Sequence, residues 1–311
     1  MNIKVVKNIA KANAITHGSL FHADEVLATA ILGHVIPNLF VARVYNVPKV
    51  LDPSVIVYDI GNGPYDHHQR GGNGERDNGV PYASAGLIWR RYGHEVCKNT
   101  ADPEDVWEYV DRFLVQGVDA SDNGVLPAIK YQAQAMSVAQ IVSGFYPVWD
   151  ADMTPDVRGL TAADYAFVRA VEFVSTILDN TIKFADAKAR AKYRVEEAID
   201  NAEDGVMVLS QYMPWKECLL KNTSAKAADI RVVVYPDKRN GYAWCTVPHR
   251  AEAPDAWRGL NGEALQEVTG CKTAVFVHTG GFLGGARALE DSISMAKRVA
   301  ATSIDEGLQT A

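Results

Sequence analysis

The feature that most constrains the fold is an alternation of two hydrophobic periods within the first hundred residues. Three short runs of β-branched and apolar residues have the length of strands: ANAIT (12–16), LFVARVY (39–45) and VIVYDIG (55–61). Two longer segments have helical spacing, DEVLATAILGHV (24–35) and SAGLIWRRYG (84–93). The order strand, helix, strand, strand, helix is typical of an α/β fold with a parallel sheet.

The rest of the chain divides into a helix-rich stretch and a region of mixed elements. Helical patterns cover residues 103–124, 133–145 and 161–201. Downstream we expect strands at 205–211, 230–236, 242–248 and 273–278, a helix at 262–270, a glycine turn at 279–286 and a last helix from Leu289. This change predicts two domains: a parallel-sheet catalytic domain over residues 1–190, ending in a long connecting helix, and a smaller α+β substrate-binding domain over residues 191–311.

Histidine and aspartate side chains gather where the predicted strands of the first domain end. Four of them lie at a strand end or on the turn that follows it: His17, His22, Asp24 and Asp59. Because ligands collect at the carboxyl ends of parallel strands, we expect these four to meet at one edge of the sheet. The glycine-rich segment after the third strand adds Asp66, His67 and His68.

A divalent metal accounts for this cluster better than separate structural roles do. One histidine alone is easily placed as a helix cap or a core residue, but several desolvated acids need cationic partners, and the local sequence supplies only Arg70. Mixed imidazole and carboxylate ligands suit Mn²⁺, Fe²⁺, Co²⁺ or Zn²⁺ better than Ca²⁺. Two ions about 3.5–4 Å apart would need a bridging carboxylate, and such pairs activate water and hold phosphoryl oxygens.

The segment GVDASDNG carries two further acids, Asp119 and Asp122, near the end of a predicted helix. A carboxylate in this position is unfavourable for the helix dipole. In one interpretation the segment is a solvated helix end followed by a turn. In the other, Asp119 is a further metal ligand that enters from a helix beside the sheet.

Glycines dominate a second segment, VFVHTGGFLGGARALE, in the C-terminal region. Backbone N–H groups at Gly280 and Gly281 can approach a phosphate closely, and the helix that begins near Leu289 would present its positive end. His278 and Arg287 can add charge-assisted hydrogen bonds. The alternative is a plain turn, so this segment gains its meaning only in combination with the metal cluster.

Bulk properties exclude several classes of protein. The 311 residues are 48% hydrophobic and 22% charged, without a long apolar run or a signal-peptide pattern, so we expect a packed, cytoplasmic protein with no membrane partner. The net charge of −7 argues against a broad basic face for long duplexes, but not against a small basic patch in a cleft. The four cysteines are scattered without a C-x-x-C pair, which argues against a zinc knuckle.

Five motifs follow one another from the start of the chain to its end. They are HGSLFHADE (17–25), YDIGNGPYDHHQRG (58–71), GVDASDNG (117–124), PDAWRGLNGEAL (254–265) and VFVHTGGFLGGA (275–286). In this order they resemble the Myg family (the melanocyte proliferating gene protein and its microbial relatives), a branch of the DHH phosphoesterase superfamily. The first two motifs are the most specific, because a His-x₄-His-x-Asp pattern and a strand-end Asp precede the DHH triplet.

The resemblance implies an α/β catalytic domain, a linker helix and a smaller substrate domain, with the active site between the domains. Its expected cofactor is one or two Mn²⁺ ions, with Mg²⁺, Co²⁺ or Zn²⁺ as alternatives. The implied metal ligands are His17, His22, Asp24, Asp59 as the bridge, His67 and Asp119. His68 would face the substrate phosphate, and Asp66 would orient a histidine without binding the metal. The candidates for substrate binding are Arg70, His278, Gly280, Gly281 and Arg287.

Three functions are compatible with these patterns. The first is a divalent-metal-dependent phosphodiesterase in which a metal-activated water attacks phosphorus in line; the resemblance implies a 3′-to-5′ exonuclease on single-stranded RNA or short oligonucleotides. The second is a small-molecule phosphatase or pyrophosphatase with the same metal site, which the acidic net charge favours because long strands reward many phosphate contacts. The third is a catalytically silent metal-binding or partner-binding protein. A homo-oligomer is compatible with all three.

Overall fold

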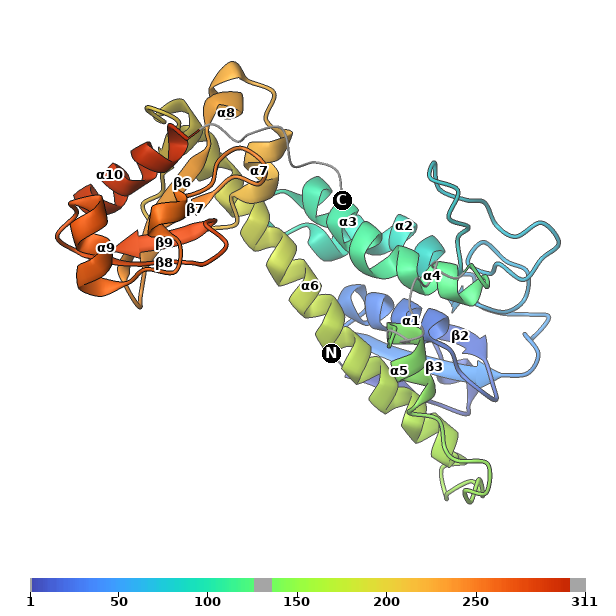
Figure 1. Cartoon of the computed structure of the whole chain (residues 1–311). Helices are drawn as coiled ribbons and strands as arrows, with labels where there is room; N and C mark the ends of the chain where they lie inside the picture. The colour runs from blue at the N-terminus through green and yellow to red at the C-terminus, as the bar shows by residue number, and fades with distance from the viewer. Residues whose placement is uncertain (1, 126–135, 303–311) are drawn as a thin grey trace. The chain divides into compact units, whose positions relative to one another are not determined.

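The chain folds as two compact units. A computed structural model describes residues 2–125 and 136–302 (Figure 1). The first unit is Met1–Ala187 and the second is Lys188–Ala311, and the long helix α6 (Ala162–Asp200) has residues in both. The first unit contains a parallel sheet and the second contains another sheet with helices, so the predicted α/β fold class is confirmed.

The sheet of the first unit has four parallel strands in the order β1-β3-β2-β4. They are β1 (Asn2–Val5), β2 (Ala14–His17), β3 (Asn38–Val44) and β4 (Ile56–Val57). Strand β1 was not expected from the sequence, and β4 is shorter than the strand predicted at residues 55–61. After Val57 the chain makes a single bridge between Tyr58 and Tyr65, and Asp59 then takes a positive φ of 56°. This left-handed backbone ends the strand, and it is uncommon for a residue other than glycine.

Helices accompany the parallel sheet of the first unit. The predicted helices at 24–35 and 84–93 are α1 (Ala23–Val35) and α2 (Ser84–Cys97), which pack against each other. The helix predicted at 133–145 is described only in part, as α5 (Val138–Ser143), because residues 133–135 lie outside the described residues. A short 3₁₀ turn, η1 (Ile9–Lys11), precedes β2.

The helix predicted over 103–124 contains an irregular turn in its middle. It begins as α3 (Pro103–Val110), continues as the π-helical segment η2 (Asp111–Val115), and ends as α4 (Gln116–Asp122). A π turn inside an α-helix is rare and often lies at a functional site. The two acids of GVDASDNG are both on α4, so they follow this irregularity.

The second unit contains a five-stranded sheet with a core on each face. The strand order is β5-β6-β7-β9-β8, where β5 (Val206–Val208) pairs in parallel with β6 (Val232–Asp237) and the other pairs are antiparallel. Val232 and Val234 pack into one core with α10 (Leu289–Ala300), whereas Val233 packs into the other with the end of α6. This alternation follows the two-residue period of a strand. The remaining elements are β7 (Gly241–Thr246), β8 (Ala274–Val277), β9 (Leu283–Ala286), α7 (Lys216–Lys221), α8 (Ala225–Asp229), α9 (Gly262–Thr269) and η3 (Asp255–Trp257).

The glycine turn predicted at 279–286 is only half a turn, because Leu283–Ala286 form strand β9. A Cβ atom on Gly284 would lie 2.3 Å from Cζ2 of Trp244, which is fully buried. Gly284 is therefore required for the close approach of β9 to the ring on the neighbouring strand β7. The true turn lies at residues 279–282, where Gly281 has a φ of 70°.

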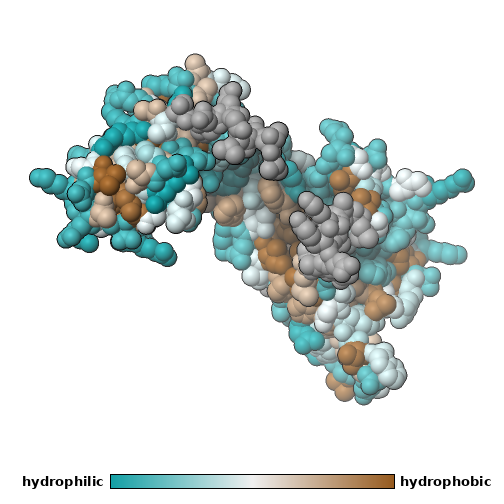
Figure 2. Space-filling view, in the orientation of Figure 1, coloured by the Kyte–Doolittle hydropathy of each residue, from teal (hydrophilic) through white to brown (hydrophobic). Residues whose placement is uncertain are grey.

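Both units keep most of their apolar side chains inside. In the view of Figure 2, hydrophilic residues (teal) cover most of the surface and hydrophobic residues (brown) form small patches. Within the residues that the structure describes, no helix is long and apolar enough to span a membrane.

Candidate metal centre

Among the described residues, eight histidine and aspartate side chains and Glu25 form three groups in the first unit, beside a cavity of about 610 Å³. The loop after β2 and the start of α1 line one side of this cavity, and the segment after β4 lines another. Helices α4 and α5 contribute Val118, Ser121, Asp122, Ala139 and Ser143 to its wall. The predicted meeting of side chains at the carboxyl ends of β2 and β4 is therefore what the structure contains.

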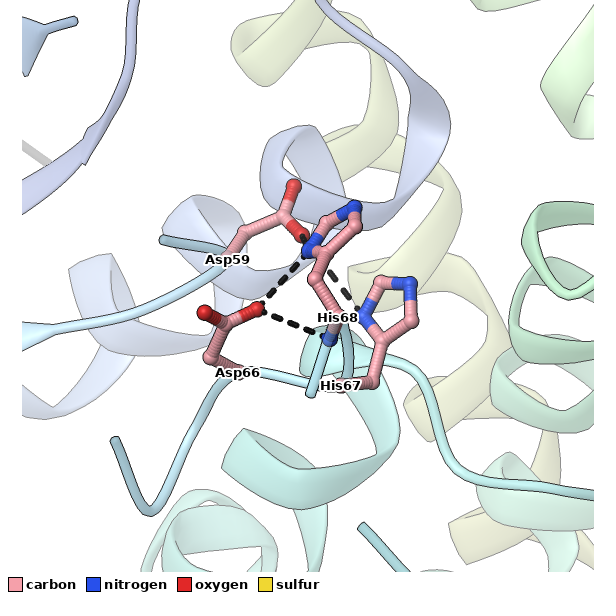
Figure 3. Close-up of side chains that lie close together, drawn as sticks. All are labelled: Asp59, Asp66, His67 and His68. Carbon is pink, nitrogen blue, oxygen red and sulfur yellow. Dashed lines mark hydrogen bonds and ion pairs between the residues drawn. The ribbon is translucent and has the colours of Figure 1, made fainter. Parts of the chain in front are cut away.

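Asp59 lies at the centre of the cluster. Its carboxylate is 3% exposed, and its two oxygens face different histidines. Oδ2 is 3.3 Å from Nε2 of His17, while Oδ1 is 3.6 Å from Nδ1 of His67 and 3.5 Å from Nδ1 of His68. Figure 3 shows this carboxylate beside both rings of the DHH segment. The positive φ of Asp59 turns its side chain into the cluster, as strained backbone often does at functional sites.

His67 connects Asp59 to two further carboxylates. Its Nδ1 lies 3.6 Å from Oδ2 of Asp24, and its Nε2 lies 2.9 Å from Oδ2 of Asp122. Burial disfavours the charged ring, but the nearby carboxylates of Asp122 and Asp59 prevail and raise the pKa of His67. In this arrangement His67, Asp24 and Asp122 offer ligand atoms that all lie within 4.8 Å of one another.

The N-terminus of helix α2 holds Asp24 in place. The backbone N–H groups of Ser84 and Ala85 donate to its two oxygens, at 2.9 and 2.6 Å. These donors have no partner within the helix itself, and the helix dipole favours a negative charge there. Complete burial nevertheless raises the pKa of Asp24 well above its usual range, and the charges of Asp59 and Asp122 raise it further. A cation at this point would relieve both effects.

His17 and Glu25 form the opposite side of the cluster. Nδ1 of His17 donates to the carbonyl oxygen of Gly18 at 2.9 Å, and its Nε2 lies 3.0 Å from Oε1 of the fully buried Glu25. Burial disfavours the charged ring, but Asp59 and Glu25 together raise the pKa of His17 to about 11. His22 completes a group of three with these two residues, although its own side chain is exposed.

Asp66 and His68 form a pair at the rim of the cavity. Nδ1 of His68 lies 2.8 Å from Oδ1 of Asp66, and the backbone N–H groups of His68 and Asn62 also donate to this carboxylate. These bonds outweigh burial and lower the pKa of Asp66. Because Asp66 holds Nδ1, the other ring nitrogen of the half-exposed His68 can face the cavity.

Asp119 takes a different place from the other predicted ligands. One of its oxygens accepts the N–H of Gly86 at 2.9 Å, and the other accepts from Nη1 of Arg76 at 2.7 Å. Burial raises the pKa of Asp119 to about 7, although Arg76 opposes this rise. A Cβ on Gly86 would lie 1.9 Å from Oδ2 of Asp119, so only glycine permits this contact. Its role as a metal ligand stays a prediction, and Asp122, one turn further along α4, is the acid that reaches His67.

The predicted substrate-binding residues belong to both units. Arg70 is exposed on the first unit. His278 and Gly280 lie at the turn between β8 and β9, where the N–H of Gly280 donates to Nδ1 of His278 at 3.0 Å. Gly281 is in the same turn, but Arg287 follows the other end of β9, a strand that spans roughly 13 Å at about 3.3 Å per residue. The role of each in substrate binding stays a prediction.

The donor set of the cavity fits a divalent metal. Imidazole nitrogens and carboxylate oxygens from both sides point at one another, and the described residues that line the cavity include neither lysine nor arginine. Oε1 of Glu25 is buried, and apart from its 3.0 Å contact with Nε2 of His17 it has no hydrogen-bond partner among the described residues. Mixed nitrogen and oxygen ligands of this kind suit Mn²⁺, Co²⁺ or Zn²⁺. These histidine and carboxylate side chains would hold the metal.

Metal binding is expected to raise the melting temperature. A metal present at 100 times its Kd stabilises the folded state by about 2.7 kcal/mol. For a domain of this size, that corresponds to a rise of roughly 5–10 °C. Thermal unfolding of metal-free protein with and without Mn²⁺ measures the shift, and an Asp59→Asn variant should show a much smaller one. An unchanged midpoint in the wild-type chain would contradict a metal centre.

The chain resembles known proteins over most of its length. The chain is 31% identical over 324 residues to a MYG1 protein of Schizosaccharomyces pombe, covering 91% of this chain and 95% of the relative. It is 29% identical to a MYG1 protein of Saccharomyces cerevisiae, over 96% of each chain. It is also 29% identical to the protein of Homo sapiens named MYG1 exonuclease, over 91% of this chain and 84% of the relative. No solved structure matches the chain.

The fold and the cluster define an α/β protein with a candidate metal centre of histidine and acidic side chains. The model of the family MYG1_exonuc, described as uncharacterised protein family UPF0160, matches residues 13–299. The chain therefore belongs to this family, and the resemblance to the Myg family is confirmed.

Proposed function

We propose that this chain is a divalent-metal-dependent phosphodiesterase. The proposed reaction is exonucleolytic, in the 3′-to-5′ direction, on single-stranded RNA or short oligonucleotides, and the proposed cofactor is Mn²⁺. Relatives named MYG1 exonuclease support a nuclease-like activity. The metal cluster supports hydrolysis, because such clusters serve phosphoryl chemistry.

The observation that carries this proposal is the position of Asp59. Its two oxygens face His17 on one side and His67 and His68 on the other, at 3.3–3.6 Å. A carboxylate placed in this way can bridge two ions or present one ion to a phosphate. A structural carboxylate would instead be expected to pair with a lysine or an arginine, and within residues 2–125 and 136–302 neither lines the cavity.

Two groups of residues have different proposed roles: one group would bind the metal, and His68 would contact the substrate phosphate. His17, His22, Asp24, Asp59 and His67 would hold the metal, with Asp24 fixed by the first N–H groups of α2. When bound, the metal supplies an electrophile that stabilises charge on the phosphoryl oxygens and makes water more acidic. His68, oriented through Nδ1 by Asp66, is the side chain that would contact the substrate phosphate from the rim.

One observation favours a smaller substrate as the second candidate. In the part of the chain that the structure describes, no lysine or arginine lines the cavity, and the net charge of the chain is −7. A long strand gains affinity from many phosphate contacts with basic side chains. A small-molecule phosphatase or pyrophosphatase would use the same metal site without such contacts.

A substrate-length series separates these functions. We expect 5′-labelled RNA oligonucleotides, from a dinucleotide upward, to shorten from their 3′ ends only when Mn²⁺ is present. Turnover restricted to dinucleotides or small phosphoesters would favour the second candidate. No turnover with any divalent ion would leave a catalytically silent binding protein. A matched series of 5′-labelled DNA tests whether the substrate preference is for RNA.

The wider assignments belong to the same proposal. We assign the metal chemistry to residues 1–190, including the linker helix, and propose that residues 191–311 form a smaller substrate-binding domain that adds to the contacts made by His68 and Arg70. Arg70, His278, Gly280, Gly281 and Arg287 are proposed to bind the substrate, and Asp119 is proposed as a further metal ligand. A cytoplasmic location and a homo-oligomeric state are compatible with this activity.

A further inference from the structure

We propose that Glu25 is a metal ligand, and that it gives the centre two ion positions of different composition. This inference rests on the proposed metal-dependent function. The first position would use His17, His22 and Glu25, and the second would use Asp24, His67 and Asp122, because in each group the ligand atoms lie within 4.8 Å of one another. Asp59 would serve both positions through its two oxygens.

Glu25 has one oxygen that its structural role does not use. It occupies the third position of α1, where Oε2 accepts the N–H of His22 at 2.9 Å and so completes a capping box. Oε1 is buried and lies 3.0 Å from Nε2 of His17, and no other described group donates a hydrogen bond to it. A cap needs one carboxylate oxygen, whereas a buried oxygen that is not neutralised is costly. The second oxygen therefore faces the cluster, where a protonated His17 or a metal ion can neutralise it.

The tautomer of His17 supports the same conclusion. Its Nδ1 lies 2.9 Å from the carbonyl oxygen of Gly18, so Nδ1 carries the proton of the neutral ring and Nε2 presents a lone pair. Nε2 lies 3.0 Å from Oε1 of Glu25 and 3.3 Å from Oδ2 of Asp59. In the absence of a metal a proton on Nε2 joins these three atoms, and a metal ion would take the place of that proton between the same atoms.

The two positions differ in their chemistry. The first has two imidazoles and one carboxylate of its own, whereas the second has one imidazole and two carboxylates. Nitrogen-rich sites favour Zn²⁺ and Co²⁺, and carboxylate-rich sites accept Mn²⁺ and Mg²⁺ more readily. Without Glu25, the first position would have only the carboxylate that it shares through Asp59.

Replacing Glu25 by glutamine separates the two roles of this residue. Glutamine keeps the capping box, because its side-chain oxygen also accepts the N–H of His22. It removes the negative charge at the first position. Asp122→Asn is the matched variant for the second position, since Asp122 contacts His67 rather than His17.

The test is a titration of metal-free protein with Mn²⁺, followed by calorimetry and by the electron paramagnetic resonance of free Mn²⁺. We expect the wild-type chain to bind two ions. Glu25→Gln should bind one of them as the wild type does and the other about 10- to 100-fold more weakly, the range seen when a group that supports a metal site is lost. Asp122→Asn should weaken the other ion instead. Circular dichroism of both metal-free variants checks that they are folded.

Two results would overturn the inference. If Glu25→Gln binds both ions with wild-type affinity, Glu25 is only a helix cap. If the wild-type chain binds a single ion that Glu25→Gln does not weaken, the first position does not exist. Failure of the proposed function gives a different result: a wild-type chain that binds both ions as described but does not shorten RNA contradicts the nuclease function and leaves this inference standing.

Discussion

Replacing Asp59 by asparagine is expected to lower kcat/KM on RNA about a thousandfold. The reason is that the carboxylate faces both histidine groups, so its loss weakens the hold on any metal in the cavity. A metal contributes several kcal/mol to the stabilisation of a charged transition state. A loss of about 4 kcal/mol corresponds to a thousandfold in rate. Initial rates over a range of RNA and Mn²⁺ concentrations measure the effect.

Asparagine is the right replacement because of the backbone. Asp59 has a φ of 56°, and asparagine tolerates this region better than other residues with a side chain. Alanine would combine the loss of the carboxylate with backbone strain. The control is Asp52→Asn, an exposed acid seven positions earlier, which should leave the rate unchanged. A folded Asp59→Asn protein with activity within tenfold of the wild type would rule out the proposed role.

Replacing Arg76 by methionine is expected to lower the free energy of unfolding of the first unit by about 3–5 kcal/mol, the range for breaking a buried ion pair. The guanidinium donates to both oxygens of Asp111, at 2.8 and 2.6 Å, and to Asp119 at 2.7 Å. It also lies over the ring of Tyr82, 4.3 Å from its centroid. Methionine fills the space but leaves two carboxylates without a cation. Urea unfolding, followed with hydrogen exchange in α2, measures the loss.

The deficit of Arg76→Met should grow with pH. Burial raises the pKa of Asp119 to about 7 even beside Arg76, and removal of the cation raises that pKa further. A raised pKa of a carboxyl group means that the folded state holds the proton more tightly, so stability falls as pH rises through neutrality. The difference from wild type should therefore be larger at high pH than at low pH. Arg70→Met, at an exposed position, should change stability by no more than about 0.5 kcal/mol.

Local patterns predicted most of the fold because they act over a few residues. The run IRVVVYP became β6, and the helical spacing at 24–35 became α1. The predictions were wrong where contacts between residues far apart in the sequence determine the local structure. Glycines at 284 and 285 were interpreted as part of a turn, but they allow a strand to approach Trp244. No property of that short segment indicates which ring lies beside it.

The sequence predicted the part of the candidate site that lies at the ends of strands, but not the part that lies on helices. His17 and Asp59 follow strands of one parallel sheet, so the topology itself brings them together. Asp119 and Asp122 are different, because they are on one helix and only its rotation decides which acid faces His67. That rotation depends on Arg76, which comes from a loop 43 positions earlier in the chain than Asp119. Glu25 was not predicted as a site residue, because an acid in the first turn of a helix is common without any further role.

The π-helical segment at Asp111–Val115 sets the angular phase of α4. A π turn accommodates one extra residue, and each residue advances a helix by about 100° and 1.5 Å. A regular helix one residue shorter would therefore turn both Asp119 and Asp122 away by more than a quarter of a revolution. One acid would leave Arg76 and the other would leave His67. Relatives that differ in length by one residue before α4 would consequently need a different acid to complete the cluster, although every ligand on the sheet side could stay the same.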